Sequence, residues 1–282
     1  MRVRSAVTTL VVLGAAGAGV VAVVRGTGPL PDPEGCTAVV ERHTVSLDTE
    51  QAENAALIAA IGVHRRLPAR AVSIALATAY QESKMINVEH GDRDSLGLFQ
   101  QRPSQGWGTE AQILDPVHAT NAFYDALVKI DGYESMRITE AAQKVQRSAY
   151  PEAYEDHAED GRALASALTG WSAHTFSCVV RPDKTYDDQR RSVLREELGN
   201  VFGATPSNLD SRRVAVTIGV GASAHRRGWA IASYAVAQAK RLGISQVSYD
   251  GRTWHDGDAS EAGWRTAGST TAPGDAVRIT VR

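Results

Sequence analysis

The hydrophobic periodicity of this 282-residue chain changes near residue 212. Between Asp48 and Gly170, apolar residues recur at the three- and four-residue spacing of amphipathic helices. Beyond residue 212, the β-rich runs RVAVTIGV, ISQVSYDGRTW and DAVRITV surround one amphipathic segment, GWAIASYAVAQAKRLG. The pattern predicts a mainly α protein, with a helical domain over residues 48–178 and a small α/β module over residues 212–282. A charged helix and linker are expected between them, over residues 179–211.

Start and stop signals delimit the helices of the first domain. They predict helices that begin near Asp48, Pro68, Asp115, Thr139 and Tyr150. The last of these is expected to end at Gly170, because glycine readily takes the left-handed conformation that closes a helix. Residues 84–114 lack helical periodicity, so we expect a long structured loop there.

The N-terminus carries a long uncharged run. Two arginines precede Ser5–Val24, which is long enough to span about 30 Å of hydrocarbon as a helix. We therefore expect residues 1–25 to be a signal anchor that ties the chain to the membrane. A cleaved signal peptide is the alternative, since Ala16-Gly17-Ala18 offers a small-residue cleavage site. Both readings place the remainder outside the cytoplasm, either membrane-anchored or secreted.

The two cysteines, Cys36 and Cys178, stand just outside the ends of the predicted helical domain. Outside the cytoplasm, an even count favours a disulfide. We expect this bond to clasp the domain at its two ends, with residues 26–47 forming the linker and clasp. Neither cysteine has a Cys/His cluster nearby, so a zinc site is not expected.

Composition and motifs argue against several other classes of function. Hydrophobic residues make up 43% of the chain and charged residues 22%, which suits a packed globular protein, and a net charge of −2 argues against nucleic-acid binding. Gly219-Val220-Gly221 lacks the third glycine and the following helix of a dinucleotide-binding loop. The spacing of His255–Asp258 fits no standard metal site. We expect no metal and no organic cofactor.

Glu82 is the strongest candidate for catalysis. Ala71, Ala75, Thr78 and Glu82 share one face of the second helix, and the alanines allow neighbouring helices to approach closely. Glu82 stands where this apolar face ends and a polar loop begins. A carboxyl group at such a boundary is poorly solvated and holds its proton more tightly, as a general acid requires. The alternative is a solvated glutamate at a helix C-terminus.

The residues around Glu82 form a recognisable order. It runs Glu82-Ser83, Asn87, Ser95, Gly97-Leu98-Phe99-Gln100 and Pro103. This order resembles the lysozyme-like fold of lytic transglycosylases and goose-type lysozymes, in an actinobacterial branch, over about residues 48–170. The C-terminal module is similar to small domains found beside wall hydrolases. The resemblance departs at Val145-Gln146-Arg147-Ser148, where such families carry a Tyr-Asn-Ala-Gly segment. Tyr150 and Tyr154 follow and are candidates for the missing aromatic residue.

The resemblance implies cleavage of the β-1,4 glycan strand of peptidoglycan, with Glu82 as general acid and then base. In lytic transglycosylases the sugar's own 6-hydroxyl attacks and leaves a 1,6-anhydro end. In a hydrolytic, goose-type reaction a second carboxylate holds a water, and Asp92 and Asp94 are candidates, with turn-capping as their alternative role. A non-catalytic wall-binding or scaffold protein that retains the fold is the other alternative. The resemblance names no protein partner.

The substrate-binding candidates are the residues of the loop and the tyrosines beyond it. They are Ser83, which we expect to orient Glu82, and Ser95, Gly97, Gln100, Gln101, Trp107, Tyr150 and Tyr154.

Overall fold

The structure is a computed structural model that describes residues 32–282, apart from 149–151, 183–184, 186, 188 and 268–273. The expected signal anchor, residues 1–25, and the candidate Tyr150 lie outside the described residues. Among the residues that are described, no helix is long and apolar enough to cross a membrane. Residues 34–282 form one compact unit.

The predicted helices of the first domain are present. They are α2 (Thr49–His64), α3 (Ala69–Ser83), α5 (Pro116–Leu127), α6 (Ile138–Gln146) and α7 (Ala158–Leu168). Asp48 caps α2 through a capping box with Gln51, and the Asp115 side chain caps α5, so both predicted helix starts are confirmed. Helix α7 begins later than expected, because a 3₁₀ turn, η2 (Glu155–His157), precedes it. Only the 3₁₀ turn η1 (Pro103–Gln105) and the four-residue α4 (Glu110–Ile113) interrupt the described loop between α3 and α5.

A three-stranded antiparallel sheet joins the two ends of this region. Its order is β2 (His43–Leu47), β1 (Gly35–Val40) and β3 (Phe176–Val179). Cys36 and Cys178 face each other in the β1–β3 register and form a disulfide with an S–S distance of 2.05 Å. The predicted disulfide is therefore confirmed. Strands β1 and β2 occupy part of the segment 26–47, for which linker and clasp were expected.

The C-terminal part contains α8 (Gln189–Phe202), α9 (Ala222–Ala237), α10 (Ala239–Leu242) and a six-stranded antiparallel sheet. The strand order is β4 (Ser207–Asn208), β5 (Arg213–Thr217), β9 (Ala276–Val281), β6 (Ile244–Tyr249), β7 (Arg252–His255) and β8 (Arg265–Thr266). A helix does follow Gly221, contrary to the prediction, because α9 begins at Ala222. The first turns of α9 carry Ser, His and Arg, so the apolar periodicity that indicates a helix begins only later in the segment.

These two sheets make the protein mixed α/β, with about 47% helix and 18% strand. The expectation of a mainly α protein is corrected accordingly. The strand content was underestimated because the hairpin of β1 and β2 is short and its pairing partner, β3, lies more than a hundred residues away in the chain. Local periodicity does not reveal such a pairing.

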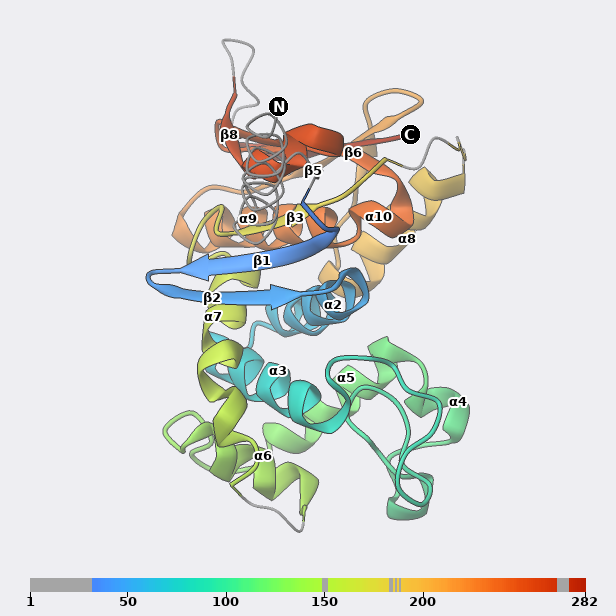
Figure 1. Ribbon diagram of the computed structural model, residues 1–282, viewed down its shortest axis with the longest axis vertical. Helices are drawn as coiled ribbons and strands as arrows, with labels where there is room; N and C mark the ends of the chain where they lie inside the picture. Colours follow the sequence, from blue (N-terminus) through green and yellow to red (C-terminus); the bar gives the residue numbers. More distant parts are fainter. Residues whose placement is uncertain (1–31, 149–151, 183–184, 186, 188, 268–273) are drawn as a thin grey trace, which may run out of the picture. The chain divides into compact units, whose positions relative to one another are not determined.

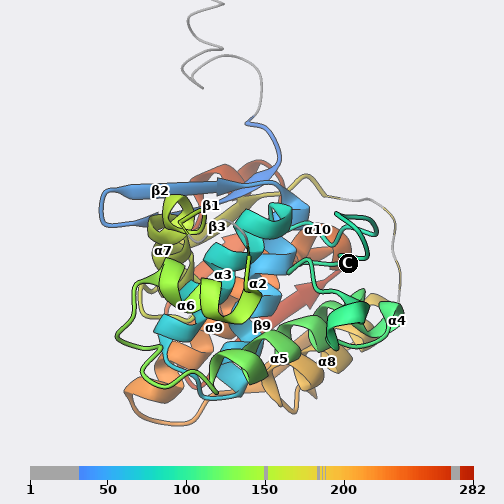
Figure 2. The same ribbon diagram turned by 90° about the horizontal axis from the view of Figure 1, so that it is seen from below.

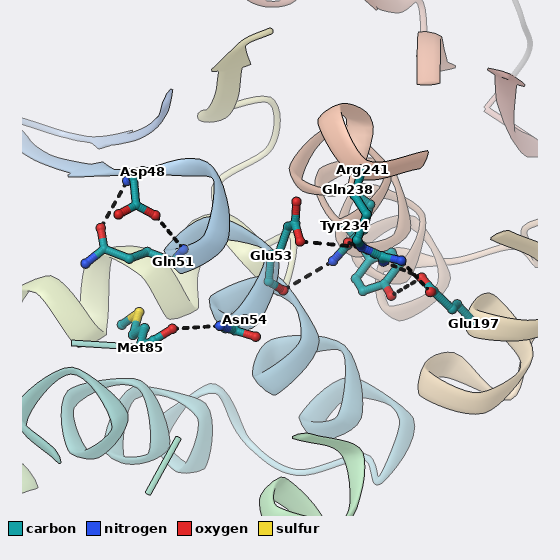
Figure 3. A network of polar contacts seen from close by, with 9 residues as sticks. All are labelled: Asp48, Gln51, Glu53, Asn54, Met85, Glu197, Tyr234, Gln238 and Arg241. Atoms are coloured by element: carbon teal, nitrogen blue, oxygen red, sulfur yellow. Dashed lines mark hydrogen bonds and ion pairs between the residues drawn. The ribbon is translucent and has the colours of Figure 1, made fainter. Parts of the chain in front are cut away.

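Helix α2 lies at the centre of the unit, between α9 on one side and α3 and α5 on the other (Figures 1 and 2). Nine of its residues are buried, six of them alanine or glycine, which lets the surrounding helices approach closely. A polar network connects α2 to the C-terminal part (Figure 3). Arg241 lies 3.4 Å from Glu53 on α2 and 2.8 Å from Glu197 on α8. One hydrophobic core runs through both parts.

Candidate functional site

Glu82 lies in the last turn of α3, where the helix leaves the core. Residues 71–79 of α3 are all buried, and Ala71, Ala75 and Thr78 on the face of Glu82 are 0% exposed. Glu82 itself is half-buried. The helix ends at Lys84, whose φ of 58° is left-handed, and Met85 follows with a φ of 61°. The carboxylate therefore stands at the boundary between apolar core and polar loop, as the sequence predicts.

The left-handed turn after Glu82 is held by two amides of α2. Gln51 Nε2 donates to the Lys84 carbonyl at 2.9 Å, and the buried Asn54 Nδ2 donates to the Met85 carbonyl at 2.7 Å (Figure 3 shows the second bond). Backbone carbonyls at a helix end lack helical partners, so such bonds fix the direction in which the chain leaves α3. Sequence reasoning missed both residues, because an amide on an alanine-rich helix carries no sign of its partner.

Tyr154 is in direct polar contact with Glu82. Its Oη donates to Glu82 Oε1 at 2.6 Å, across 72 positions of sequence. The tyrosine is 1% exposed. Burial, and then the Glu82 carboxylate, raise the pKa of Tyr154 far above its usual value, so the phenol keeps its proton and acts as a donor. The structure thus brings Tyr154, one of the two candidates for the missing aromatic residue, to Glu82, while Tyr150 lies outside the described residues.

Close packing of α7 on α3 brings Tyr154 to this position. A Cβ placed on Gly161 of α7 would lie 2.7 Å from the Ser73 carbonyl and 3.1 Å from the Ala77 Cβ, so the two helices meet backbone to backbone. The turn before α7 is tied to α3 by His157, whose Nε2 lies 3.0 Å from Gln81 Oε1. Burial, followed by Lys84, lowers the pKa of His157, which favours the neutral ring. Small residues in both helices therefore determine how near Tyr154 comes to Glu82.

The loop that carries Leu98 and Phe99 is fixed at two carbonyls. Ser83 Oγ donates to the Leu98 carbonyl at 2.8 Å, and Gln146 Nε2 donates to the Phe99 carbonyl at 2.7 Å. Leu98 and Phe99 are fully buried, and the Phe99 ring stacks on Phe123 at 4.6 Å. Ser83 therefore joins the end of α3 to the loop, and Gln146 does the same from the end of α6. Gln146 was not singled out, although it lies in the 145–148 segment where the expected family motif is replaced.

Gly97 and the two glutamines have different environments. Gly97 has a φ of 73°, and a Cβ there would lie 2.7 Å from the Ile113 carbonyl, so a side chain does not fit. Gln100 is half-buried with a φ of 46°, and its amide donates to the Gly97 carbonyl at 3.3 Å. Gln101 is 1% exposed and its amide donates to the Ala119 carbonyl. Gln100 is therefore the better placed of the two to meet a ligand, while Gln101 joins the loop to α5.

The two candidate second carboxylates also differ. Asp94 Oδ1 accepts from Arg102 Nε at 2.7 Å, and its Oδ2 accepts from the Ser104 backbone N–H at 2.9 Å. Hydrogen bonds from Ser104 and from Arg102 hold the pKa of Asp94 well below its usual range. Asp92 is largely exposed and lies 3.9 Å from Arg93. Asp94 therefore braces the loop, as in the turn-capping alternative.

A cleft of about 610 Å³ opens between the end of the loop and helices α5 and α6. It is lined by Gln105, Trp107, Ala126, Lys129, Ile130, Lys144, Val145, Gln146 and Arg147. Trp107 is half-buried, packs against the core and also lines this cleft. Ser95 is 8% exposed, and its backbone N–H donates to the Asp92 carbonyl, so it belongs to the loop turn. Gln146 lines this cleft and also donates to the Phe99 carbonyl, which follows the Leu98 carbonyl that Ser83 bonds.

The geometry therefore brings together Glu82, Tyr154 and Ser83 with the loop segment 97–100. No group of three or more His, Cys, Asp or Glu side chains within the described residues is placed to hold a metal ion. Such a site suits proton transfer by one carboxyl group that a phenol orients. No protein-family model matches the chain, and no curated protein matches it.

Proposed function

We propose that this protein cleaves the β-1,4 glycan strand of peptidoglycan as a lytic transglycosylase with a lysozyme-like domain. The observation that supports the proposal most directly is the 2.6 Å hydrogen bond from Tyr154 to Glu82, at the end of the buried face of α3. The family that the sequence resembles has a tyrosine beyond the catalytic loop, and its usual motif is absent here. Tyr154 supplies that aromatic group from a different position in the chain.

In this proposal Glu82 protonates the glycosidic oxygen and then removes the proton of the attacking hydroxyl. Tyr154 holds one carboxylate oxygen, which leaves the other oriented for proton transfer. Its donated hydrogen bond also stabilises the anion that forms once the proton has left. Ser83 keeps the end of α3 and the Leu98 carbonyl at a fixed separation, and Gln100 contacts the sugar.

The absence of a second suitable carboxylate among the candidates favours transglycosylation over hydrolysis. Both oxygens of Asp94 are engaged by the Arg102 guanidinium and the Ser104 amide, and Asp92 points to solvent. With one carboxyl group, attack by the sugar's own 6-hydroxyl is the simpler route, and it yields 1,6-anhydromuramyl ends. Goose-type hydrolysis is the alternative, with ordinary reducing ends.

An extracytoplasmic location is part of the same proposal. The Cys36–Cys178 disulfide is the observation that supports it, because such bonds persist in oxidising compartments. The uncharged run Ser5–Val24 would then anchor the chain in the membrane, or serve as a cleaved signal. The protein would thus act on the wall beside the membrane or as a secreted enzyme.

Digestion of purified peptidoglycan, followed by mass spectrometry of the soluble products, tests the proposal. Glu82→Gln keeps the shape of the side chain and removes its transferable proton, so turnover should fall by at least about 10²–10⁴-fold. Glu89→Gln makes the same chemical change at an exposed position of the same loop region and should leave turnover unchanged. A Glu82→Gln protein with near-normal turnover would contradict the proposal.

The products distinguish the alternatives. Anhydro ends support the transglycosylase assignment. Reducing ends, together with a large defect in Asp94→Asn, would move the protein to the hydrolytic class. A native chain that binds the wall and releases no fragments would indicate a non-catalytic wall-binding protein.

A further inference from the structure

A second cleft, of about 570 Å³, lies where the end of α7 meets the loop between β5 and α9. Neither Glu82 nor any residue of the loop after it lines this cleft. Its walls are mainly apolar and come from Ala173, Ile218, Val220 and Tyr249, with Trp171 and Arg226 beside them. A volume of this size falls within the range of ligand-binding pockets.

The most unusual feature of this cleft is an exposed aromatic ring with a guanidinium stacked on it. Trp171 is 61% exposed, and Val220 beside it is fully exposed. The Arg226 Cζ lies 4.0 Å from the centroid of the Trp171 ring. An exposed tryptophan leaves a large apolar surface in contact with water, so a ring of this kind at the edge of a cleft is suited to being covered by a ligand.

The Arg226 guanidinium lies over an aromatic ring, whereas many arginines of the described chain lie beside a carboxylate. Arg102 and Arg241, for example, lie 2.7 and 2.8 Å from carboxylate oxygens. Within the part of the chain that the structure describes, the Arg226 guanidinium contacts the Trp171 ring and forms no hydrogen bond or ion pair with another side chain. Stacking occupies the face of a guanidinium and leaves its in-plane N–H groups directed outward. Arg226 therefore presents a fixed positive group with unused donors at the cleft.

The backbone around Gly170 fixes the positions of Trp171 and Arg226. Gly170 precedes Trp171 and has a φ of 79°. A Cβ on Gly170 would lie 2.1 Å from the Arg226 carbonyl oxygen, so only glycine allows the end of α7 to approach α9 this closely. That approach places the Trp171 ring over the Arg226 side chain.

The two carboxylates at or beside the cleft each have a partner. His225 Nε2 lies 2.8 Å from Asp250 Oδ2, and Asp275 lies 3.4 Å from Arg278. Among the described residues that line the cleft, the Arg226 guanidinium is the charged group that no carboxylate engages, and its positive charge complements an anion. The planar fork of an arginine suits a carboxylate in particular, through two parallel hydrogen bonds. The apolar walls suit small aliphatic groups next to that carboxylate.

We infer that this cleft binds the terminal carboxylate of a short peptide with small apolar side chains. Arg226 would take the carboxylate, Trp171 would cover the peptide backbone, and the walls formed by Ala173, Ile218 and Val220 would receive the methyl groups. If the proposed function is correct, which this assignment of the source assumes, the natural ligand is the alanine-terminated stem peptide of peptidoglycan. The cleft would then hold the wall while Glu82 acts elsewhere on the glycan.

Isothermal titration of the full chain in detergent tests the inference, with acetyl-lysyl-D-alanyl-D-alanine as the probe. Saturable binding of the acid is expected, and its C-terminal amide should bind at least about 10-fold more weakly, because the charge-assisted pair is lost. Arg226→Gln and Trp171→Ala should each weaken binding of the acid by about 10-fold or more. Arg195→Gln, an exposed site on α8 that does not line the cleft, is the matched control and should bind as the native chain does.

Equal binding of the acid and the amide, or an Arg226→Gln protein with native affinity, would overturn the inference. A preference for the L-alanyl-L-alanine isomer would overturn the stem-peptide assignment. Trp171 is mostly exposed, so its replacement should leave the fold intact, and circular dichroism verifies this. Peptide binding and glycan cleavage are measured separately. If the native chain binds the peptide but the Glu82→Gln protein stays fully active, only the proposed function is refuted. If the native chain does not bind the peptide and the Glu82→Gln protein is inactive, only this inference is refuted.

Discussion

Removing the bond between Cys36 and Cys178 should lower the free energy of unfolding by about 5 kcal/mol. The bond joins two residues 142 positions apart. In the chain-entropy model, a loop of this length removes about 17 cal/mol/K from the unfolded state, or about 5 kcal/mol at 25 °C. Both cysteines are 1% exposed, so a Cys36→Ala/Cys178→Ala protein also loses a little packing.

For a domain of this size, 1 kcal/mol corresponds to about 2–4 °C in Tm, so the double variant should melt about 10–20 °C below the native chain. Differential scanning calorimetry measures the shift. Thr37→Ala/Ser177→Ala is the matched control, because these residues form the next pair of the same β1–β3 register and are not bonded. The control should melt within a few degrees of the native chain.

A shift smaller than about 3 °C in the cysteine variant would refute the reasoning from loop entropy. Two thiols that react in the unfolded, unreduced native chain would refute the bond itself. A control variant that melts as low as the cysteine variant would mean that the strands are sensitive to any substitution, and that the disulfide is not the cause.

Three further predictions concern the surroundings of Glu82. Tyr154→Phe should reduce turnover on purified peptidoglycan by about 10-fold, because it removes the hydrogen bond to the carboxylate, and an unchanged rate would contradict the proposed role. Ser104 and Arg102 lower the pKa of Asp94, so its contribution to stability is present at neutral pH and is lost as the pH falls below the unfolded value of about 3.9. The Tm difference between the native chain and the Asp94→Asn protein should therefore shrink as the pH is lowered. A difference that grows at low pH would contradict this prediction. Gly161→Val should lower the free energy of unfolding by about 1–3 kcal/mol, because its Cβ would meet a backbone carbonyl of α3. Thermal denaturation measures this loss, and an unchanged Tm would contradict the close packing of α7 on α3.

Much of the local structure was predictable from the sequence, because local signals specify it. Asp48 and Asp115 accept hydrogen bonds from the free N–H groups of the helices that follow them. The β-rich runs near residues 214, 247 and 279 form strands of one sheet, and the even cysteine count led to the correct pair. Each of these features depends on neighbouring residues or on a count, and both are visible in a linear chain.

The contacts that define the candidate site were not predictable in the same way. Glu82 was identified from the end of an apolar helix face, but the choice of Tyr154 as its partner depends on how closely α7 packs on α3 at Gly161. Asp94 was a candidate second carboxylate, and only the structure shows that Arg102 and Ser104 bond to its two oxygens. Sequence gives the type of a polar side chain, whereas its partner depends on three-dimensional packing.

The sequence by itself thus determined the helices of the first domain, the disulfide and the position of Glu82 at a helix end. Only the tertiary structure decided that Trp171 stacks with Arg226 and that α2 holds the turn after Glu82 through Asn54. The physical reason is the range of the interactions. Caps and periodicity act within a few residues, while these contacts join residues 31 and 55 positions apart in the chain.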